Sequence, residues 1–562
     1  MLSSLRRRLL PGLAKGGADH GALALAALLA LPPLVSFGAT PVPSFEAEWL
    51  AGALGLAAAC CFGVLGRGGS LAVPVSALLP VGLAALVALQ MRAGLVANRG
   101  SAWLFLAFLA WSLTLLCTGA AMRTSDRLEK TLALAAYATL ASALLNALIA
   151  AVQFFGSDQA ALALLLRGGG SARPGGNLGQ ANHLATQMAM GAVSLAWLRA
   201  SGRLALPWFL GCTLVLASGL AWPGSRSAYA LCGGLLVSIW WLTRGLAANE
   251  RRAWRQAILF LSVAFVAADF AIGALRHASS YTRFSTIQAT GEPRMVIWPA
   301  ALEMFSGAPW WGQGQGRFAG LFFQIGPGLS PSGQTTLGLT SHAHNLVLQL
   351  AAEFGLAGVA ILLLSAGLWW WRVRQAPVSS NTLWAMGLVV VIGVHSLFEY
   401  PLWYAFFLGP FAFAAGLAEG PAAARAGVRA LRLLWLGLAG IGGALLGILG
   451  NDYRFLPEIG YPVGLAQLER MHDRSLLAPY AGAILHYGLY LDADRIEDKL
   501  AFSAEMMRTL PGGGIAYRHA ILLGIAGRRA EAATAWRLAV GNYPQLAPLW
   551  ARKARESGID VP

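Results

Sequence analysis

Residues 341–371 read SHAHNLVLQLAAEFGLAGVAILLLSAGLWWW. The stretch begins with two histidines and continues as a long apolar run in which Glu353 is the one charged residue. A helix needs about 20 mostly apolar residues to cross the hydrocarbon core of a bilayer. The stretch therefore predicts a transmembrane helix over 345–371 that starts at a polar, histidine-containing boundary.

The rest of the chain repeats this apolar pattern. Of its 562 residues, 57% are hydrophobic and 12% are charged, whereas soluble domains carry about 25% charged residues. So few charges cannot cover a water-soluble fold of this size, and the abundance of apolar residues excludes disorder. We predict an all-α polytopic membrane protein with about thirteen spans. They are expected at 21–38, 48–66, 71–90, 101–118, 131–155, 182–198, 204–221, 227–243, 257–273, 345–371, 383–399, 401–418 and 433–450.

The basic residues indicate how the spans are oriented. We interpret the net charge of +16 as a sign of topology rather than of nucleic-acid binding, because cytoplasmic connections are rich in Lys and Arg. Alternate connections differ about twofold in Lys plus Arg, and the richer set includes the N-terminal segment. This pattern predicts a cytoplasmic N-terminus and a C-terminus outside. It also places three segments on the outer face: 156–181, the turn at Arg226 and the long loop 274–343.

The composition changes after residue 450. Residues 451–562 hold almost half of the acidic residues of the chain and a similar number of basic ones. We predict that 1–450 form the transmembrane domain and that 451–562 form a separate, small helical domain outside the membrane. Four residues recur at helical spacing, as in the second helix of a tetratricopeptide-type repeat: Ala530, Ala533, Trp536 and Ala539.

Charged residues within the predicted spans are rare. Such residues usually mark ion or proton pathways, but Asp269 lies near the outer end of its span and is expected to reach water. Glu353 lies deeper and is expected to face the bundle. The five cysteines all lie in apolar runs without the spacing of a metal site, and are interpreted as small buried hydrophobes. Polar residues gather instead at the outer face.

The turn 222–227 is the first candidate site on that face. Pro223 and Gly224 break the chain between two spans, and Ser225 or Ser227 can cap the next helix. The free N–H groups of that helix start and the guanidinium of Arg226 would bind an anion, ideally a phosphate. The alternative is an arginine that binds lipid headgroups.

A second candidate is the stretch 292–298. Pro293 predicts a helix start, and the apolar residues that follow predict an amphipathic helix lying on the membrane. Arg294 stands at the N-terminus of this helix, which favours anions. A simple surface anchor helix is the alternative.

The histidines of 341–345 are the third candidate. In an extended chain His342 and His344 point the same way, but helix formation from here would turn them about 200° apart, so only one is expected to reach a given reacting atom. An imidazole at the water–membrane boundary suits a general base, and a histidine that caps the helix or meets headgroups is the alternative. No further ligands complete a metal site. The glycine-rich 312–318 is no nucleotide fingerprint, but would let backbone approach a ligand closely.

These stretches resemble the bacterial O-antigen ligase and polymerase (Wzy/WaaL) superfamily and, within it, the PglL-type protein O-oligosaccharyltransferases. The likeness covers the whole membrane part, and the C-terminal domain also looks like the one those transferases carry. The stretches concerned are 41–49, 177–183, 225–227, 294–302, 341–355 and 399–404.

The resemblance implies a reaction. An oligosaccharide on undecaprenyl diphosphate would be transferred in the periplasm to a hydroxyl acceptor, such as that of a pilin, without metal, cofactor or nucleotide sugar. Arg226 and Arg294 would hold the diphosphate, and His344, with His342 as second candidate, would activate or position the hydroxyl. Further candidates are Arg317 and Arg283 for the diphosphate, and Gln180, His183, Glu399 and Tyr404 for shaping the substrate site.

Other functions compete with this one. Within the superfamily, the acceptor could be the lipid A core, as for an O-antigen ligase, or a growing chain, as for a polymerase. A flippase or transporter of lipid-linked glycans would show internal repeats and broken helices, and neither is visible in the sequence. A non-catalytic scaffold carrying a repeat domain would leave the Arg and His residues of the outer face unexplained.

Overall fold

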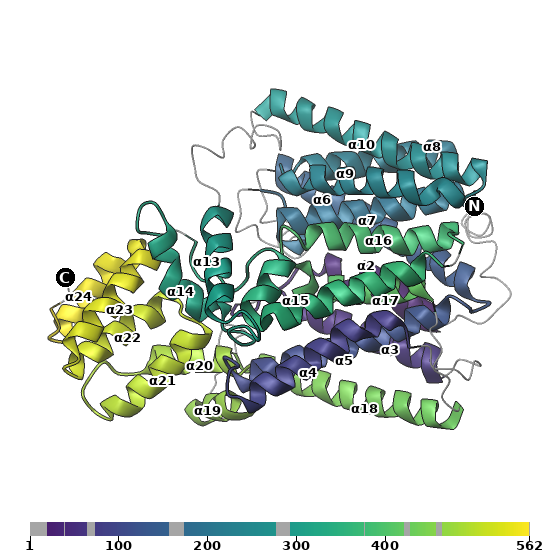
Figure 1. Ribbon diagram of the computed structural model, residues 1–562. Helices are drawn as coiled ribbons and strands as arrows, with labels where there is room; N and C mark the ends of the chain where they lie inside the picture. Colours follow the sequence, from purple (N-terminus) through teal and green to yellow (C-terminus); the bar gives the residue numbers. More distant parts are fainter. Residues whose placement is uncertain are drawn as a thin grey trace.

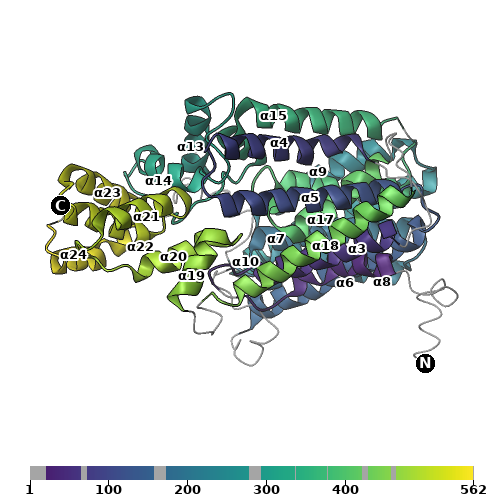
Figure 2. The same cartoon turned by 90° about the horizontal axis from the view of Figure 1, so that it is seen from below.

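The computed structural model describes residues 20–38, 40–64, 73–156, 173–276, 293–335, 337–375, 377–420, 428–456 and 464–560. Within these ranges the chain is helical and contains no strand, which confirms the predicted all-α class. Long helices run side by side in a bundle, and the C-terminal helices pack at one end of it, which we term the domain end (Figure 1). A view turned by 90° shows α13, α14 and the C-terminal helices at that same end (Figure 2).

Thirteen bundle helices are present among the described residues. They are α2 (His20–Ala30), α3 (Phe45–Val64), α4 (Leu78–Arg92), α5 (Arg99–Met122), α6 (Leu128–Phe155), α7 (Ala181–Ala200), α8 (Leu206–Ala221), α9 (Arg226–Leu242), α10 (Ala248–Arg276), α15 (Leu346–Val373), α16 (Ser380–His395), α17 (Ala405–Glu419) and α18 (Val428–Tyr453). The remaining helices are α13 (Arg294–Gly307), α14 (Phe318–Leu329), α19 (Leu465–Arg474), α20 (Ala478–Gly488), α21 (Ile496–Thr509), α22 (Gly513–Ile525), α23 (Arg529–Asn542) and α24 (Ala547–Glu556).

Each predicted span overlaps one bundle helix. Six stretches of the described chain are long and apolar enough to cross a membrane, so this is an integral membrane protein. They comprise α3, α5, α6, α10, α15, and α4 with the short turn before it. The remaining bundle helices are shorter or less apolar, so a total of thirteen crossings stays a prediction.

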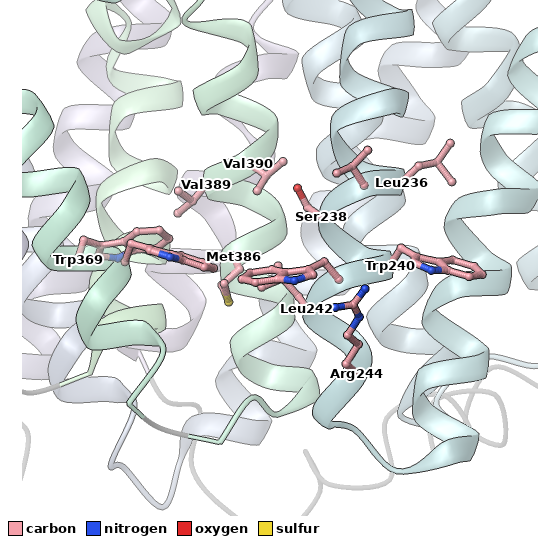
Figure 3. A pocket seen from close by; sticks show the side chains of 12 residues that line it. Leu236, Ser238, Trp240, Leu242, Arg244, Trp369, Met386, Val389 and Val390 are labelled. Carbon is pink, nitrogen blue, oxygen red and sulfur yellow. The ribbon is translucent and has the colours of Figure 1, made fainter.

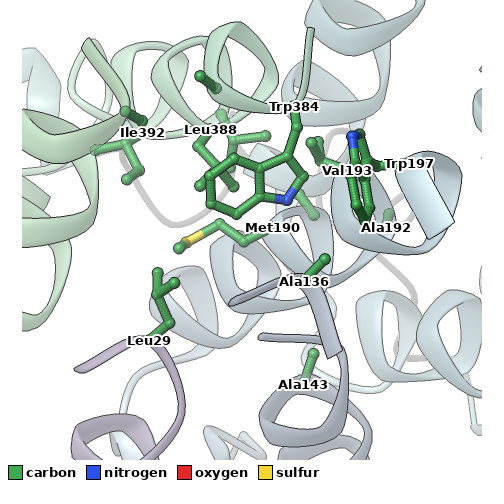
Figure 4. Close-up of a cluster of buried hydrophobic side chains, with 14 of the residues drawn as sticks. Leu29, Ala136, Ala143, Met190, Ala192, Val193, Trp197, Trp384, Leu388 and Ile392 are labelled. Carbon is green, nitrogen blue, oxygen red and sulfur yellow. The ribbon is translucent and has the colours of Figure 1, made fainter. Parts of the chain in front are cut away.

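Large aromatic side chains and small residues share the core of the bundle (Figure 4). Trp197 and Trp384 are buried almost completely. Their indole N–H groups donate to Asn381 Oδ1 at 3.0 Å and to Ser194 Oγ at 3.1 Å, so no polar group is left unpaired on either ring. Elsewhere, glycines let helices approach closely: a Cβ on Gly119 of α5 would collide with the backbone of α17.

The helix α15 is interrupted inside the bundle, which the sequence did not reveal. Gly355 has φ 61° and ψ −157°, and the loop 309–316 fills the gap. Leu356 N–H donates to Pro309 O at 2.7 Å, and the Glu353 carboxylate accepts the Gly316 N–H at 2.9 Å. The loop therefore supplies partners for the groups that the break sets free.

This packing corrects the interpretation of the glycine-rich loop. A Cβ on Gly312 would collide with the backbone of Glu353 and Phe354, so the glycine allows contact with α15 rather than with a ligand. Asp269 is a second correction, because it is completely buried and accepts a hydrogen bond from the Tyr229 hydroxyl at 2.9 Å. Asp269 therefore pairs with Tyr229 of α9 and does not reach the solvent as we expected.

The C-terminal helices form their own apolar core against α14. Tyr517 packs edge-on against Trp536 at 4.9 Å, and Asn542 Nδ2 donates to Phe323 O of α14 at 2.7 Å. The separate domain over 451–562 and its tetratricopeptide-type character stay predictions.

The predicted helix after Pro293 is present as α13, with Met295 73% exposed and Ile297 buried. Its position on the membrane surface stays a prediction.

Candidate active site

Five bundle helices begin or end around one polar cluster at the domain end. There α7, α9, α15 and α17 begin and α16 ends, close to the start of α13 (Figure 1). Helix ends carry free N–H and C=O groups and are less apolar than helix centres. The bundle therefore brings polar side chains from distant parts of the chain together at this position.

Glu399 lies at the centre of the cluster. It follows the end of α16 and is 5% exposed. Its carboxylate meets the His344 Nδ1 at 2.6 Å, the Asn182 Nδ2 at 2.7 Å and the Arg294 Nη2 at 3.4 Å. Three separate segments of the chain thus share one buried acceptor.

The surroundings keep this carboxylate ionised. Burial alone raises the pKa of Glu399, but the hydrogen bond from His344 and the positive charges of His344, His395 and Arg294 outweigh burial and hold the pKa at about 2. An ionised carboxylate only accepts hydrogen bonds. The Nδ1 of His344 therefore carries a proton, and in the neutral imidazole the lone pair lies on Nε2.

The backbone around His344 explains this position. His344 has φ 52°, in the left-handed region that few residues other than glycine adopt. On its C-terminal side, Asn345 caps α15 by accepting the Leu348 N–H at 3.1 Å and donates to Leu397 O at 3.0 Å. The His344 side chain stays 28% exposed. A strained residue held by its neighbours is typical of a functional site.

His342 has a different environment. Its ring stacks on Tyr400 at 4.2 Å and meets Trp403 edge-on at 5.2 Å, and the Ser341 hydroxyl lies 2.8 Å from its Nδ1. Burial and the neighbouring His344 lower the pKa of His342 to about 3, against the opposing charge of Glu399. The two histidines thus have different hydrogen-bond partners but share the Tyr400 ring. Both precede α15, so the divergence that we expected from helix formation does not apply to them.

The two predicted anion sites connect to Glu399 in different ways, Arg294 directly and the Arg226 turn through Asn182. Arg294, the first residue of α13, also donates to Phe398 O at 2.7 Å. Arg226 begins α9, and both neighbouring serines contact Asn182: Ser225 Oγ lies 2.5 Å and Ser227 Oγ 3.3 Å from its Oδ1. Neither serine caps α9 through its side chain, so the expected cap is wrong and Asn182 instead links the Arg226 turn to Glu399.

The other candidates are less closely connected. His183 is buried and packs edge-on against Tyr404 at 4.7 Å, and Gln180 directly precedes α7. Arg317 directly precedes α14, next to the loop that packs on α15, and no hydrogen bond or ion pair of the described residues joins it to Glu399. Arg283 lies outside the described residues.

Two contributors were not singled out from the sequence. Asn182 lies in a quoted stretch, but nothing marks it as the link between α9 and Glu399. Arg173 donates to Pro223 O at 2.7 Å and to Gly224 O at 3.2 Å, which fixes the turn before Arg226. Among the described residues, no group of three or more His, Cys, Asp or Glu side chains could hold a metal ion.

Three family descriptions match consecutive parts of the chain. "Protein glycosylation ligase" matches residues 174–198, "O-Antigen ligase" matches 211–363, and "Virulence factor membrane-bound polymerase, C-terminal" matches 383–557. The resemblance to the O-antigen ligase and polymerase superfamily is confirmed. The three matches together include the residues of the polar cluster. Asn182 lies in the first range, Arg226 and His344 lie in the second, and Glu399 lies in the third.

A curated relative points in the same direction. The chain is 27% identical over 382 residues to a general O-oligosaccharyltransferase of Acinetobacter baylyi. The alignment covers 65% of this chain and 64% of the relative, so it spans slightly less than two thirds of that protein. The PglL-type likeness within the superfamily therefore has support from a named transferase as well as from the glycosylation-ligase match.

Proposed function

We propose that this protein is a membrane oligosaccharyltransferase. It transfers a glycan en bloc from undecaprenyl diphosphate to a Ser or Thr hydroxyl of a periplasmic protein such as a pilin. The observation that carries the proposal is the network in which buried Glu399 orients His344 beside Arg294. The similarity to a general O-oligosaccharyltransferase and to protein glycosylation ligases supports a protein acceptor.

The geometry supports a displacement at the anomeric carbon. The Nε2 of His344 takes the proton of the acceptor hydroxyl while the hydroxyl oxygen attacks the anomeric carbon of the glycan. The bond from that carbon to the diphosphate oxygen breaks, and undecaprenyl diphosphate leaves with the electron pair. General-base assistance of this kind contributes about 10²–10⁴-fold.

The remaining charged residues serve the leaving group. Negative charge grows on the diphosphate as the bond breaks, and guanidinium groups stabilise it. Arg294 and Arg226 are the candidates, because Arg294 contacts Glu399 and the turn before Arg226 is joined to it through Asn182. Glu399 fixes the tautomer of His344 and stabilises the imidazolium that forms, as the carboxylate does in a catalytic triad.

The location follows from the basic residues. The excess of Lys and Arg in one set of connections supports a cytoplasmic N-terminus in a bacterium and a domain end in the periplasm. The protein would then be a multi-pass protein of the inner membrane, with about thirteen crossings and its reaction centre outside. A lipid-linked donor and a secreted acceptor meet on that side.

A second candidate is an O-antigen ligase that uses the lipid A core as its acceptor. The match of the O-antigen ligase family to 211–363, which includes Arg226, Arg294 and His344, favours it. The chemistry at the anomeric carbon is the same for both acceptors. The identity of the acceptor therefore separates the two functions.

Co-expression with a lipid-linked glycan pathway and candidate pilins tests the proposal, with mass spectrometry of Ser- and Thr-containing peptides as the readout. We expect glycosylated pilin from the wild type and none from His344→Ala, because the base is gone. His342→Ala should retain part of the activity, and His20→Ala, an exposed histidine at the start of α2, should retain all of it. Unmodified pilin with glycosylated lipid A core would favour the ligase, and full activity of His344→Ala would reject the role of His344.

A further inference from the structure

Asn182 joins two parts of the candidate site that carry opposite charges. It is the second residue of α7. Its Nδ2 lies 2.7 Å from Glu399 Oε1, and its Oδ1 lies 2.5 Å from the hydroxyl of Ser225, which directly precedes Arg226. A side chain that contacts both parts can transmit a displacement from one to the other. Whether it also orients them depends on the direction in which each hydrogen bond runs.

The charge of Glu399 sets those directions. An ionised carboxylate only accepts hydrogen bonds, so the Asn182 atom that faces Glu399 must be the amide nitrogen, and the carbonyl oxygen must face Ser225. A carbonyl oxygen cannot donate, so the Ser225 hydroxyl gives its one proton to Asn182. Ser225 is completely buried, and its hydroxyl cannot turn to water instead. The Ser227 hydroxyl, 2.7 Å from that of Ser225, must then donate to Ser225.

The result is a chain of hydrogen bonds that all point to one acceptor. At the start of α9, Ser227 donates to Ser225, and Ser225 donates to Asn182. Asn182 in turn donates to Glu399, and the His344 Nδ1–H donates to the second oxygen of Glu399 at 2.6 Å. Hydrogen bonds to an ionised acceptor are about twice as strong as neutral ones, and each bond in such a chain polarises the next. One carboxylate thus holds both the start of α9 and the tautomer of His344.

These polar contacts matter because α9 packs loosely towards α15. Further along the helix, exposed side chains of α9 line a shallow groove between α9 and α15 (Figure 3). The turn before Arg226 is held by hydrogen bonds instead, since Arg173 contacts its backbone carbonyls and Asn182 contacts the Ser225 hydroxyl. Loss of the Asn182 side chain should therefore affect the position of Arg226 as well as that of Glu399.

We propose that Asn182 is a positioning residue that couples the Arg226 turn to His344 through this directed chain, with the Glu399 carboxylate as the common acceptor. The inference rests on the proposed function, in which Arg226 holds the diphosphate and His344 activates the hydroxyl. The coupling keeps the leaving group and the base correctly placed relative to each other, and a misplacement of about 1 Å can lower a rate by about 10²-fold.

An exchange of charge between positions 182 and 399 tests the direction of the chain. In Glu399→Gln, the donors Asn182 and Arg294, which both point at Oε1, attract the amide oxygen. The amide nitrogen then faces His344 and donates to its Nδ1. Asn182→Asp, added to Glu399→Gln, places an acceptor at position 182. The amide can donate to this carboxylate and turn its oxygen to His344, which restores the Nδ1–H tautomer.

The effect of Asn182→Asp should therefore change sign with the residue at position 399. In glycan transfer by purified protein in nanodiscs, Asn182→Asp alone should lower kcat by at least about tenfold, because it sets a second carboxylate against Glu399. Added to Glu399→Gln, it should raise kcat by at least about tenfold over Glu399→Gln alone. Added to Glu399→Ala, it should give no gain, because no side chain remains to orient His344. A loss with all three residues at position 399, or no loss with Glu399 in place, would overturn the proposal.

The serines test the other end of the chain. The double variant Ser225→Ala/Ser227→Ala removes both contacts between Asn182 and the turn. We expect the KM for the donor to rise by at least about threefold and kcat to stay within about twofold, because the His344 tautomer is kept. Ser238→Ala is the matched control, since Ser238 lies roughly 20 Å further along α9 and lines the groove (Figure 3). An unchanged KM in the double variant would contradict the coupling.

A measurement of the tautomer separates this inference from the proposed function. If the wild type transfers no glycan, the proposed function fails, but ¹⁵N NMR of histidine-labelled protein still locates the proton on His344, with His344→Ala to assign its signals. At about pH 8, where imidazole is neutral, Nδ1 should carry the proton in the wild type and in Asn182→Asp/Glu399→Gln, and Nε2 should carry it in Glu399→Gln. An Nδ1–H tautomer in Glu399→Gln, or an Nε2–H tautomer in the double variant, would reject the directed chain.

Discussion

Glu399 shows how one residue organises the candidate site. A carboxylate at a helix end inside a membrane protein is costly to bury unless it is paired, and here donors from α7, α13 and the segment before α15 surround it. These donors offset the cost of burying the carboxylate, and the buried carboxylate in turn fixes the tautomer of His344. A substitution that removes the charge of Glu399 but keeps its shape should therefore separate the orientation of His344 from the packing around Glu399.

Glu399→Gln is expected to lower kcat by about 10²-fold or more, because the amide can donate to the His344 Nδ1 and so favours the wrong tautomer.

The same variant should also change how the stability of the protein depends on pH. The pKa of Glu399 lies at about 2 in the folded protein, below its ordinary value of 4.5. Its contribution, about 3 kcal/mol, is present above pH 4.5 and is lost as the pH falls towards 2. Thermal unfolding in detergent at a series of pH values would show this loss in the wild type only.

Asp269→Asn is the matched control for that prediction. Asp269 is likewise buried and accepts a hydrogen bond, but from Tyr229 on α9 instead of from His344. It should leave kcat near the wild-type value. Equal kcat values for wild type and Glu399→Gln would contradict the orienting role of Glu399.

The sequence could suggest these residues but not their contacts. Arg226, Arg294, His344 and Glu399 were recognised from polar stretches at span ends and from a resemblance. The link from Asn182 to Glu399 joins positions 217 residues apart, and no periodicity records such a pairing. The divergence predicted for His342 and His344 assumed a helix through both residues, but α15 begins only at Leu346, and His344 has a positive φ instead.

At the scale of elements, the length of the apolar stretches predicted where the helices lie. It did not predict the break inside α15, which depends on backbone geometry. Every predicted span overlaps a helix, because about 20 apolar residues leave few alternatives in a bilayer. The break in α15 was missed, since glycine is common in transmembrane helices and gives no signal by itself. The partners in 309–316 that make the break possible lie about 40 residues earlier in the sequence.

Gly355→Ala tests this break. A Cβ at Gly355 would lie 2.6 Å from the Trp310 carbonyl carbon and 2.7 Å from the Pro309 oxygen, at a φ of 61°. We expect a loss of at least about 2 kcal/mol in the free energy of unfolding, seen as a lower Tm. Gly367→Ala, at an open and exposed position of the same helix, should be neutral or stabilising by up to about 1 kcal/mol. A Tm for Gly355→Ala equal to that of Gly367→Ala would show that the break is not required.

At the scale of the whole molecule, the C-terminal helices lie at the domain end of the bundle (Figure 1). The helix ends around Glu399 lie there too, and side chains of the C-terminal helices, among them Tyr480, line an apolar cavity of the bundle. The C-terminal helices are fixed there by backbone contacts, as when Thr335 N–H donates to Gly541 O at 2.6 Å. They therefore form part of the cavity wall rather than a tethered appendage.

The proposed function requires one orientation in the membrane. The excess of basic residues predicts that the connections at the opposite end lie in the cytoplasm, so we expect the domain end to face outward. Ser332, exposed between α14 and α15, and Thr124, exposed between α5 and α6, report on the two ends. In a cysteine-free background, a membrane-impermeant maleimide added to cells with a permeabilised outer membrane should label Ser332→Cys and leave Thr124→Cys unlabelled until the cells are lysed. The reverse pattern would place His344 in the cytoplasm, away from any periplasmic acceptor, and would reject the proposed transferase at the level of topology.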